Sequence, residues 1–132
     1  MNGERTVFLV DDEPAVLRAL SRLLRAEGYT TEVFSSGREF IDKYNPSGAG
    51  CVVLDLTMPG ITGLDVQQWL ASSDRSLPII FLTALDELPE EMQEMMQGAV
   101  DVLMKPVNAK ALISGIETAL ARDRGIRGKA EG

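Results

Sequence analysis

Short apolar runs alternate along this chain with stretches of helical periodicity, and this alternation constrains its fold more than any other feature. The runs cover residues 6–10, 29–34, 51–56, 78–83 and 102–105. Most are continuous and rich in β-branched residues, which is typical of strands covered on both faces, although the second run is mixed. The pattern therefore predicts five strands.

Each run is followed by apolar residues at helical spacing. They are Leu17, Leu20 and Leu24, then Phe40, Ile41 and Tyr44, then Val66, Trp69 and Leu70, then Met92, Met95 and Met96, and finally Ile113, Ile116 and Leu120. Strands that alternate with helices in this way predict an α/β fold, with a doubly wound five-stranded parallel sheet flanked by five helices. The strands themselves do not fix their order in the sheet.

Several residues are suited to helix ends. Pro14 fits a first helical turn, and Gly28 fits the end of the same helix. Ser36 and Glu39 have the spacing of a capping box, and Asn108 is suited to cap the last helix.

The composition excludes several classes of site. The chain has no histidine, which removes Ser-His and Cys-His catalysis and histidine zinc sites. The single cysteine, Cys51, excludes internal disulfides and cysteine zinc clusters, and its place in an apolar run favours a core role. A net charge of −7 argues against binding to nucleic acid or to an anionic membrane by this domain alone. With no apolar run near ~20 residues, we expect a reduced, cytoplasmic domain.

The residues with the most chemical potential stand where the predicted strands end. Asp11 and Asp12 follow the first run, Asp55 lies at the end of the third, Thr83 ends the fourth, and Lys105 ends the fifth. In a parallel sheet, ligands gather beyond these carboxyl ends. Three crowded carboxylates require raised pKa values or a bound cation, and Mg²⁺ suits oxygen ligands in a chain without histidine.

This set of residues at the carboxyl ends of the strands is suited to phosphoryl transfer. A carboxylate can act as the nucleophile and form an aspartyl phosphate, while an ammonium group and a hydroxyl bind the phosphoryl oxygens. Taken singly, each of these residues has an ordinary interpretation as a cap, a turn residue or a solvated lysine. Their joint occurrence at four strand ends carries the prediction.

The motifs resemble the receiver domain of two-component response regulators, of the CheY-like superfamily. They are VFLVDDEP, VVLDLTMPGITGLD, PIIFLTA and GAVDVLMKP, and the resemblance extends from about Thr6 to about Ala121. It implies the strand order 2-1-3-4-5. It also implies that a sensor histidine kinase, or a phosphotransfer protein, donates a phosphoryl group to Asp55, so that the domain is a phosphoacceptor switch and not an enzyme.

The resemblance also implies the roles of the site residues. Mg²⁺ would be bound directly by Asp12, largely through water by Asp11, by Asp55, and by the backbone carbonyl of Thr57. The hydroxyl of Thr83 and the lysine that matches the family motif, Lys105, would contact the phosphoryl group.

Three positions depart from the family pattern. Val102 stands where most relatives have the aromatic residue of the switch, and Val107 stands where phenylalanine is common. Gly115 stands where many winged-helix regulators have an arginine in a charged dimer interface. These departures weaken the aromatic switch and that type of dimer, and they leave the phosphorylation chemistry untouched.

Three other functions fit parts of the sequence. A haloacid-dehalogenase-like phosphatase needs a second aspartate two residues after the nucleophile, where this chain has Thr57. A nucleotide- or flavin-binding domain needs a glycine-rich phosphate loop, where this chain has DDEP. A pseudo-receiver that binds partners without phosphorylation stays open as the main alternative.

We expect a receiver domain at residues 1–122 and a linker-like or disordered tail at residues 123–132, which are polar and glycine-rich. The kinase should dock near the site and the first helix. The fourth helix, fifth strand and fifth helix should contact an output partner or effector domain, with a phosphorylation-dependent homodimer as a further possibility. The sequence does not decide between a stand-alone regulator and one domain of a longer protein.

Overall fold

A single parallel sheet organises the part of the chain that the computed structural model describes, residues 6–45, 50–72, 77–84 and 90–131. Its strands lie in the order β2-β1-β3-β4-β5. They are β1 (Thr6–Val10), β2 (Thr30–Phe34), β3 (Gly50–Asp55), β4 (Ile79–Thr83) and β5 (Asp101–Met104). The predicted fold class and strand order are confirmed, with strand bounds within one residue of the apolar runs.

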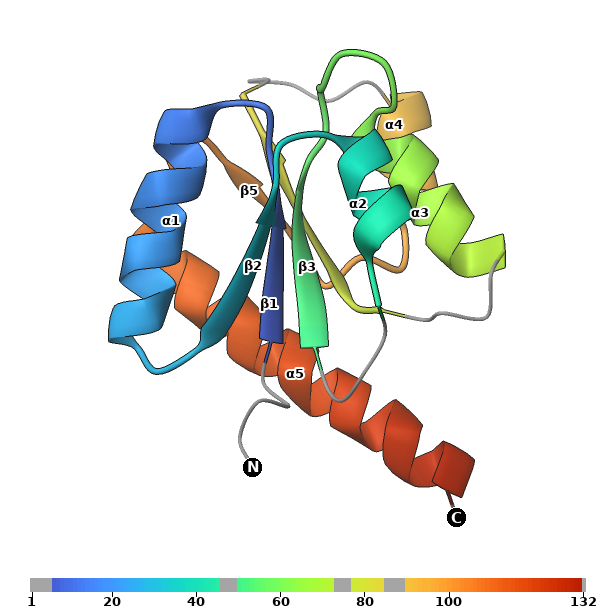
Figure 1. Cartoon of the computed structure of the whole chain (residues 1–132). Coiled ribbons are helices and arrows are strands. Elements are labelled where there is room, and N and C mark those ends of the chain that lie inside the picture. The colour runs from blue at the N-terminus through green and yellow to red at the C-terminus, as the bar shows by residue number, and fades with distance from the viewer. Residues whose placement is uncertain (1–5, 46–49, 73–76, 85–89, 132) are drawn as a thin grey trace.

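Helices cover both faces of the sheet (Figure 1). They are α1 (Pro14–Ala26), α2 (Gly37–Lys43), α3 (Gly63–Ser72), α4 (Glu90–Met95) and α5 (Ala109–Glu131). Helices α1 and α5 pack on one face, and α2, α3 and α4 lie on the other, so each face has its own apolar core. This doubly wound arrangement leaves the carboxyl ends of the strands free to carry a site.

The core beneath α2 and α3 contains a cluster of aromatic rings. Phe40 is fully buried, stacks on Tyr44 with ring centroids 4.9 Å apart, and meets Phe34 edge-on at 5.3 Å. The Trp69 ring of α3 packs beside this cluster, with its centroid 6.3 Å from that of Phe40. Edge-to-face and stacked pairs of this kind add about 0.5–1.5 kcal/mol each beyond the area that they bury. The predicted packing role of Trp69 is therefore confirmed.

The helix ends follow the sequence signals. Pro14 is the first residue of α1, and Gly28 beyond its end has a φ of 94°, which favours glycine. The Ser36 hydroxyl accepts a hydrogen bond from the Glu39 N–H at 3.0 Å. The Asn108 side chain caps α5 by accepting from the Ala111 N–H at 2.9 Å.

Helix α5 is longer than the sequence predicts. A linker-like or disordered tail was the expectation for residues 123–132, but the helix continues to Glu131. Each glycine in this stretch costs about 1 kcal/mol, and its other residues are mostly good helix formers, so a helix already under way extends over them at small cost. The buried carboxylate of Asp123 accepts a hydrogen bond from the Gly50 N–H at 2.9 Å, which fastens α5 to the start of β3. The domain boundary at residue 122 stays a prediction.

Within the described residues, no helix combines the length and the apolar character that crossing a bilayer requires.

Candidate functional site

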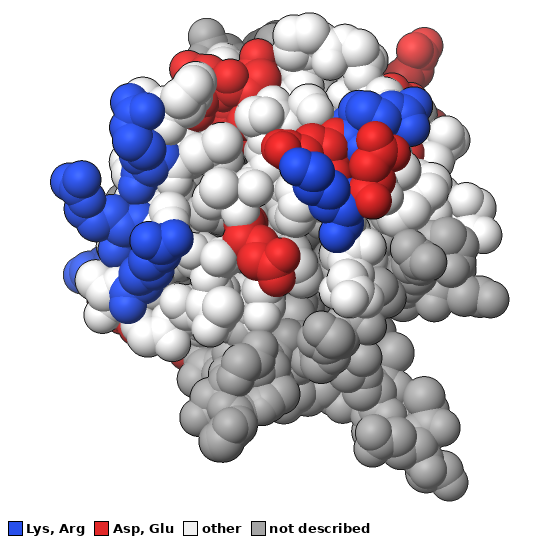
Figure 2. Space-filling view, viewed as in Figure 1, with Lys and Arg blue, Asp and Glu red and all other residues white. Residues whose placement is uncertain are grey.

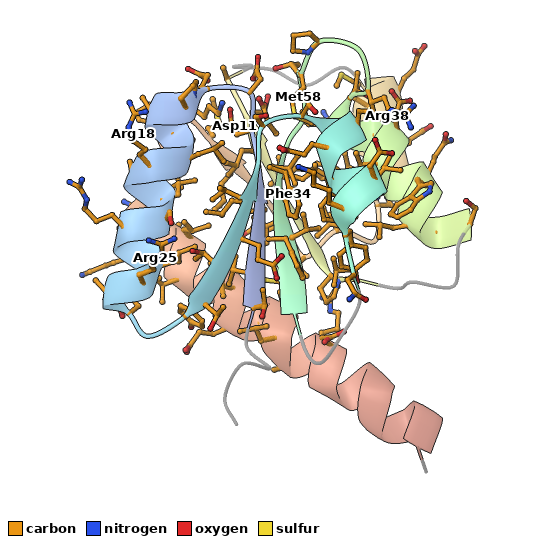
Figure 3. All side chains as sticks on the ribbon, viewed as in Figure 1. Asp11, Arg18, Arg25, Phe34, Arg38 and Met58 are labelled. Carbon is orange, nitrogen blue, oxygen red and sulfur yellow. The ribbon has the colours of Figure 1, made fainter. Side chains whose placement is uncertain are left out.

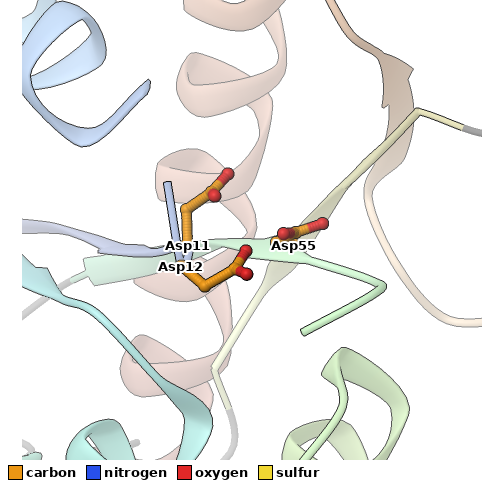
Figure 4. A group of neighbouring side chains, drawn as sticks. All are labelled: Asp11, Asp12 and Asp55. Carbon is orange, nitrogen blue, oxygen red and sulfur yellow. The ribbon is translucent and has the colours of Figure 1, made fainter. Parts of the chain in front are cut away.

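Three carboxylates meet at the carboxyl ends of β1 and β3 (Figure 4). These strands are neighbours, with Val10 opposite Leu54, so the residues that follow them lie side by side. Asp11, Asp12 and Asp55 each place an oxygen within 4.8 Å of the others. Asp11 and Asp55 are buried, whereas Asp12 is exposed. The predicted acidic cluster is therefore present, with one side open.

The carboxylate of Asp11 is only partly satisfied. Its Oδ1 accepts a hydrogen bond from the Glu13 N–H at 2.9 Å. Its Oδ2 is buried, with the Lys105 ammonium 2.9 Å away as an ion pair and no other donor in the described part of the chain. A buried carboxylate oxygen in this position has capacity for a further ligand.

The Lys105 side chain crosses from the end of β5 to this cluster. Its Nζ lies 2.9 Å from Asp11 Oδ2, 2.7 Å from Glu13 Oε1 and 3.6 Å from Asp55 Oδ2. Burial disfavours the charged form, but the hydrogen bonds to Glu13 and Asp11 outweigh burial and raise the pKa of Lys105 above its ordinary value. The lysine is therefore a fixed positive charge at the centre of the site.

Glu13 is a site residue that the sequence reasoning missed. Its carboxylate makes the shortest contact of Lys105, although the side chain is largely exposed. The available signal was a third consecutive acid after the Asp11–Asp12 pair.

Asp55 is destabilised as an anion. Burial, and then the charge of Asp11, raise its pKa from 3.8 to about 6. The hydrogen bond from the Thr57 N–H and the charge of Lys105 lower this pKa but do not compensate in full. The Thr57 N–H donates to Asp55 Oδ1 at 3.2 Å. Thr57 thus contacts the acceptor through its amide, and the predicted role of its carbonyl stays a prediction.

Thr83 ends β4 and is fully buried. It pairs with Met104 across the sheet, and its carbonyl accepts a hydrogen bond from the Lys105 N–H at 2.8 Å. The backbones of the two predicted phosphoryl-binding residues are thus joined directly. The Lys105–Pro106 peptide bond that follows is cis.

A close helix approach holds the acceptor strand in place. At Gly63, the first residue of α3, a Cβ atom would lie 2.5 Å from the Asp55 carbonyl oxygen. Only glycine permits this contact. Gly63 is not among the predicted site residues, although it lies within the motif that follows Asp55.

The residues that depart from the family pattern are at least partly buried in the structure. Val102 and Val107 are partly buried and pack against the two cores, so neither is a free surface group. Gly115 is buried, with Ile80 3.3 Å from the position of a Cβ atom. Burial raises the pKa of the Cys51 thiol to about 12, which confirms its core role.

The arrangement can bind a cation and a phosphoryl group. Carboxylate oxygens are the ligands that hard divalent cations prefer. Three features fit such an ion: the buried Oδ2 of Asp11, which only Lys105 reaches among the described residues, the raised pKa of Asp55, and the open side at Asp12. The ammonium of Lys105 is suited to phosphoryl oxygens.

Sequence comparisons agree with this geometry. Residues 7–117 match the family model of the response regulator receiver domain. The response regulator protein TodT of Pseudomonas putida is 40% identical over 114 residues, which are 86% of this chain and 50% of TodT. Nodulation protein W of Bradyrhizobium diazoefficiens is 38% identical over 118 residues, 89% of this chain and 52% of that protein. The chain thus spans about half the length of these relatives.

Solved structures support the same assignment. The response regulator StyR superimposes with a TM-score of 0.90 at 36% identity, covering 97% of this chain and 65% of StyR. A CheY-like receiver domain protein of Methanospirillum hungatei superimposes with a TM-score of 0.80 at 27% identity, covering 92% of this chain and 98% of that chain. With the acidic cluster, the lysine and the sheet order in place, this chain belongs to the family of response regulator receiver domains of two-component systems, which are signalling proteins.

Proposed function

We propose that this domain accepts a phosphoryl group on Asp55 in a Mg²⁺-dependent reaction and passes the change to an output partner. The observation that carries the proposal is the position of Asp55 at the centre of the site. It is a buried carboxylate beside two further acids, with the Lys105 ammonium 3.6 Å away.

The donor would be a phosphohistidine of a sensor histidine kinase or of a phosphotransfer protein. A carboxylate oxygen of Asp55 attacks phosphorus, a P–O bond forms, and the P–N bond breaks with its electron pair leaving on the imidazole. The attack requires the ionised carboxylate, which burial and Asp11 disfavour. Lys105 and the hydrogen bond from the Thr57 N–H favour that ionised form.

The cation site would use Asp11, Asp12, Asp55 and the Thr57 carbonyl. Mg²⁺ in this position would neutralise the crowded carboxylates and the charge of the incoming phosphoryl group. Its binding fits the buried Oδ2 of Asp11, which has the Lys105 ammonium as its one donor among the described residues. The exposed Asp12 leaves an opening for water ligands on the same side.

Lys105 and Thr83 would sense the product. The phosphoryl group adds about −1.5 to −2 charge, and the Lys105 ammonium is close enough to exchange its contact with Glu13 for a phosphoryl oxygen. The Thr83 hydroxyl would donate a hydrogen bond to another of these oxygens. Because the Lys105 N–H is bonded to the Thr83 carbonyl, the ends of β4 and β5 would respond together.

The partner surfaces follow from what surrounds the site. Next to Lys105, an apolar pocket of about 580 Å³ is lined by residues of α1 and of the loop after β5, including Ala15, Ala19 and Pro106. This pocket is our proposed dock for the kinase. Met104 of the edge strand β5 is 47% exposed, which supports α4, β5 and α5 as the output face. An effector domain, a phosphorylation-dependent homodimer and a cytoplasmic location stay predictions.

The test is phosphorylation of the chain by acetyl phosphate with Mg²⁺, read by intact-protein mass spectrometry. Wild type and Asp42→Asn, a change at an exposed aspartate of α2, should gain one base-labile phosphoryl group. Asp55→Asn and wild type in EDTA should gain none. Full labelling of Asp55→Asn would refute the acceptor assignment, and an unlabelled wild type would favour the pseudo-receiver.

A second measurement tests the cation site. Mg²⁺ should raise the unfolding temperature of wild type, since a ligand of the folded state stabilises it. The rise should be much smaller in Asp12→Asn. An equal rise in both proteins would remove Asp12 from the proposed set of ligands.

A further inference from the structure

We propose that a groove between α1 and the outer edge of β2 binds an extended acidic segment of a partner protein. The groove has a volume of about 430 Å³. Its walls come from α1 and β2, and its lining residues are Leu17, Arg18, Ser21, Arg22, Arg25 and Val33. None of these belongs to the phosphorylation site or to the pocket beside Lys105, so the proposal does not depend on the proposed function.

The groove concentrates positive charge on an acidic protein. Arg18, Arg22 and Arg25 are spaced i, i+4 and i+7, which places them along one side of α1. They form the blue group at the left of Figure 2, and Figure 3 labels Arg18 and Arg25. In the described part of the chain, no carboxylate lies within ion-pair distance of the three guanidinium groups. On a protein with a net charge of −7, this local excess of positive charge favours binding of an acidic ligand.

The floor of the groove is apolar and lies at an open sheet edge. Val33 is 46% exposed and is one of two large hydrophobic residues exposed in the described structure. β2 is the outermost strand on this side. The Phe34 carbonyl points inward and accepts from the Asp11 N–H, so the backbone of Val33, one residue earlier, points outward. An added strand would find hydrogen-bonding groups there.

The spacing of the arginines defines the ligand further. Arg18 and Arg22 are separated by about 6 Å along the helix axis, and alternate residues of a strand are separated by about 6.6 Å. A strand added at β2 would thus direct every second side chain toward the arginines. The intervening side chains would lie on the face of Glu32, opposite Val33, where a further acid is unfavourable. The ligand should therefore alternate acidic and uncharged residues.

This reasoning favours a peptide over the other possible occupants. A nucleic acid would meet the repulsion of the overall negative charge and would leave Val33 and the strand edge without a partner. A second copy of the chain would have to present an acidic strand of the same pattern. β2 itself carries one acid, Glu32, and so does not offer that pattern.

The experiment measures fluorescence anisotropy of a labelled seven-residue peptide in which threonine and glutamate alternate. A peptide of the same composition with its glutamates adjacent is the sequence control. The double variant Arg18→Ala/Arg22→Ala should bind the alternating peptide about tenfold more weakly than wild type, since it loses two exposed ion pairs. Arg38→Ala, which removes an exposed arginine of α2, should bind within about twofold of wild type. Labelling by acetyl phosphate should be unchanged in all variants, which separates this proposal from the proposed function.

Four results of the binding assay would overturn the proposal. They are absence of peptide binding at millimolar concentration, equal affinity in wild type and the double variant, tighter binding of the control peptide, and tighter binding of a single-stranded oligonucleotide of equal charge. The oligomeric state, measured by sedimentation velocity, provides a further test. If wild type forms a dimer and Arg22→Ala does not, the groove binds a second copy of this chain, and the proposal fails.

Discussion

Removal of the charge of Asp55 should stabilise the cation-free protein at neutral pH. Burial and the charge of Asp11 raise the pKa of this carboxyl from 3.8 to about 6, whereas in the unfolded chain the pKa keeps its ordinary value. Between these two values, the folded protein binds more protons than the unfolded chain. Stability therefore falls as the pH rises through this window, and above about pH 6 the ionised carboxylate opposes folding in full.

The magnitude follows from the same numbers. At 1.36 kcal/mol for each tenfold change, the difference between 3.8 and about 6 corresponds to about 3 kcal/mol. This is an upper limit, because the Lys105 ammonium 3.6 Å away loses one of its partners when the charge is removed. We expect Asp55→Asn to raise the free energy of unfolding by about 1–3 kcal/mol at about pH 7.5, and the unfolding temperature by about 3–10 °C.

The assay is urea unfolding followed by far-UV circular dichroism in EDTA, at about pH 7.5 and about pH 5. The gain should shrink at the lower pH, where the wild-type carboxyl is already largely protonated. Asp42→Asn, on the exposed face of α2, is the matched control and should show neither a gain nor a pH dependence of it. A variant less stable than wild type at pH 7.5, or a gain equal at both pH values, would refute the reasoning.

Three other predictions concern the packing around the site and the sheet. Gly63→Ala should destabilise the fold by about 1–3 kcal/mol, because the new Cβ would lie 2.5 Å from the Asp55 carbonyl oxygen. An unfolding temperature equal to that of wild type would show that α3 shifts to make room for the Cβ. Asp123→Ala should lower the free energy of unfolding by about 1–3 kcal/mol, because the buried Gly50 N–H loses its acceptor. Asp123→Asn keeps an acceptor oxygen and should lose much less in the same urea assay. Equal losses in the two variants would point to a role other than that hydrogen bond. Cys51, with its pKa raised to about 12 by burial, should react with Ellman's reagent only after unfolding; rapid reaction of the native protein would contradict its burial.

The acidic cluster could be predicted from the sequence because topology alone brings it together. Asp11 and Asp55 each end a buried run, and parallel strands place such residues at one edge of the sheet whatever the helices do. The contact between Glu13 and Lys105 could not be predicted in this way. It joins side chains 92 residues apart in sequence, and it depends on how the loops after β1 and β5 approach each other.

The length of α5 escaped prediction for a related reason. Local composition favours a tail, because residues 123–132 are polar and rich in glycine. The hydrogen bond between Asp123 and Gly50 joins residues 73 apart, and no periodic pattern announces it. Packing at Asp123 holds the helix at the position where local composition predicts its end, and the residues that follow continue a helix that is already formed.

The charge balance of the site indicates how the proposed phosphorylation of Asp55 would act on Lys105. Asp11 and Asp55 are buried close together, and Lys105 is the cation that lies beside both in the described structure. Its third contact, with the exposed Glu13, is the shortest at 2.7 Å, but Glu13 is the partner that water can solvate when the ammonium leaves. A phosphoryl group on Asp55 would therefore draw the ammonium away from Glu13 first, while the contact with Asp11 could persist. We therefore expect the ammonium to move away from Glu13 and toward the end of β4, where the backbone N–H of Lys105 is already bonded to Thr83.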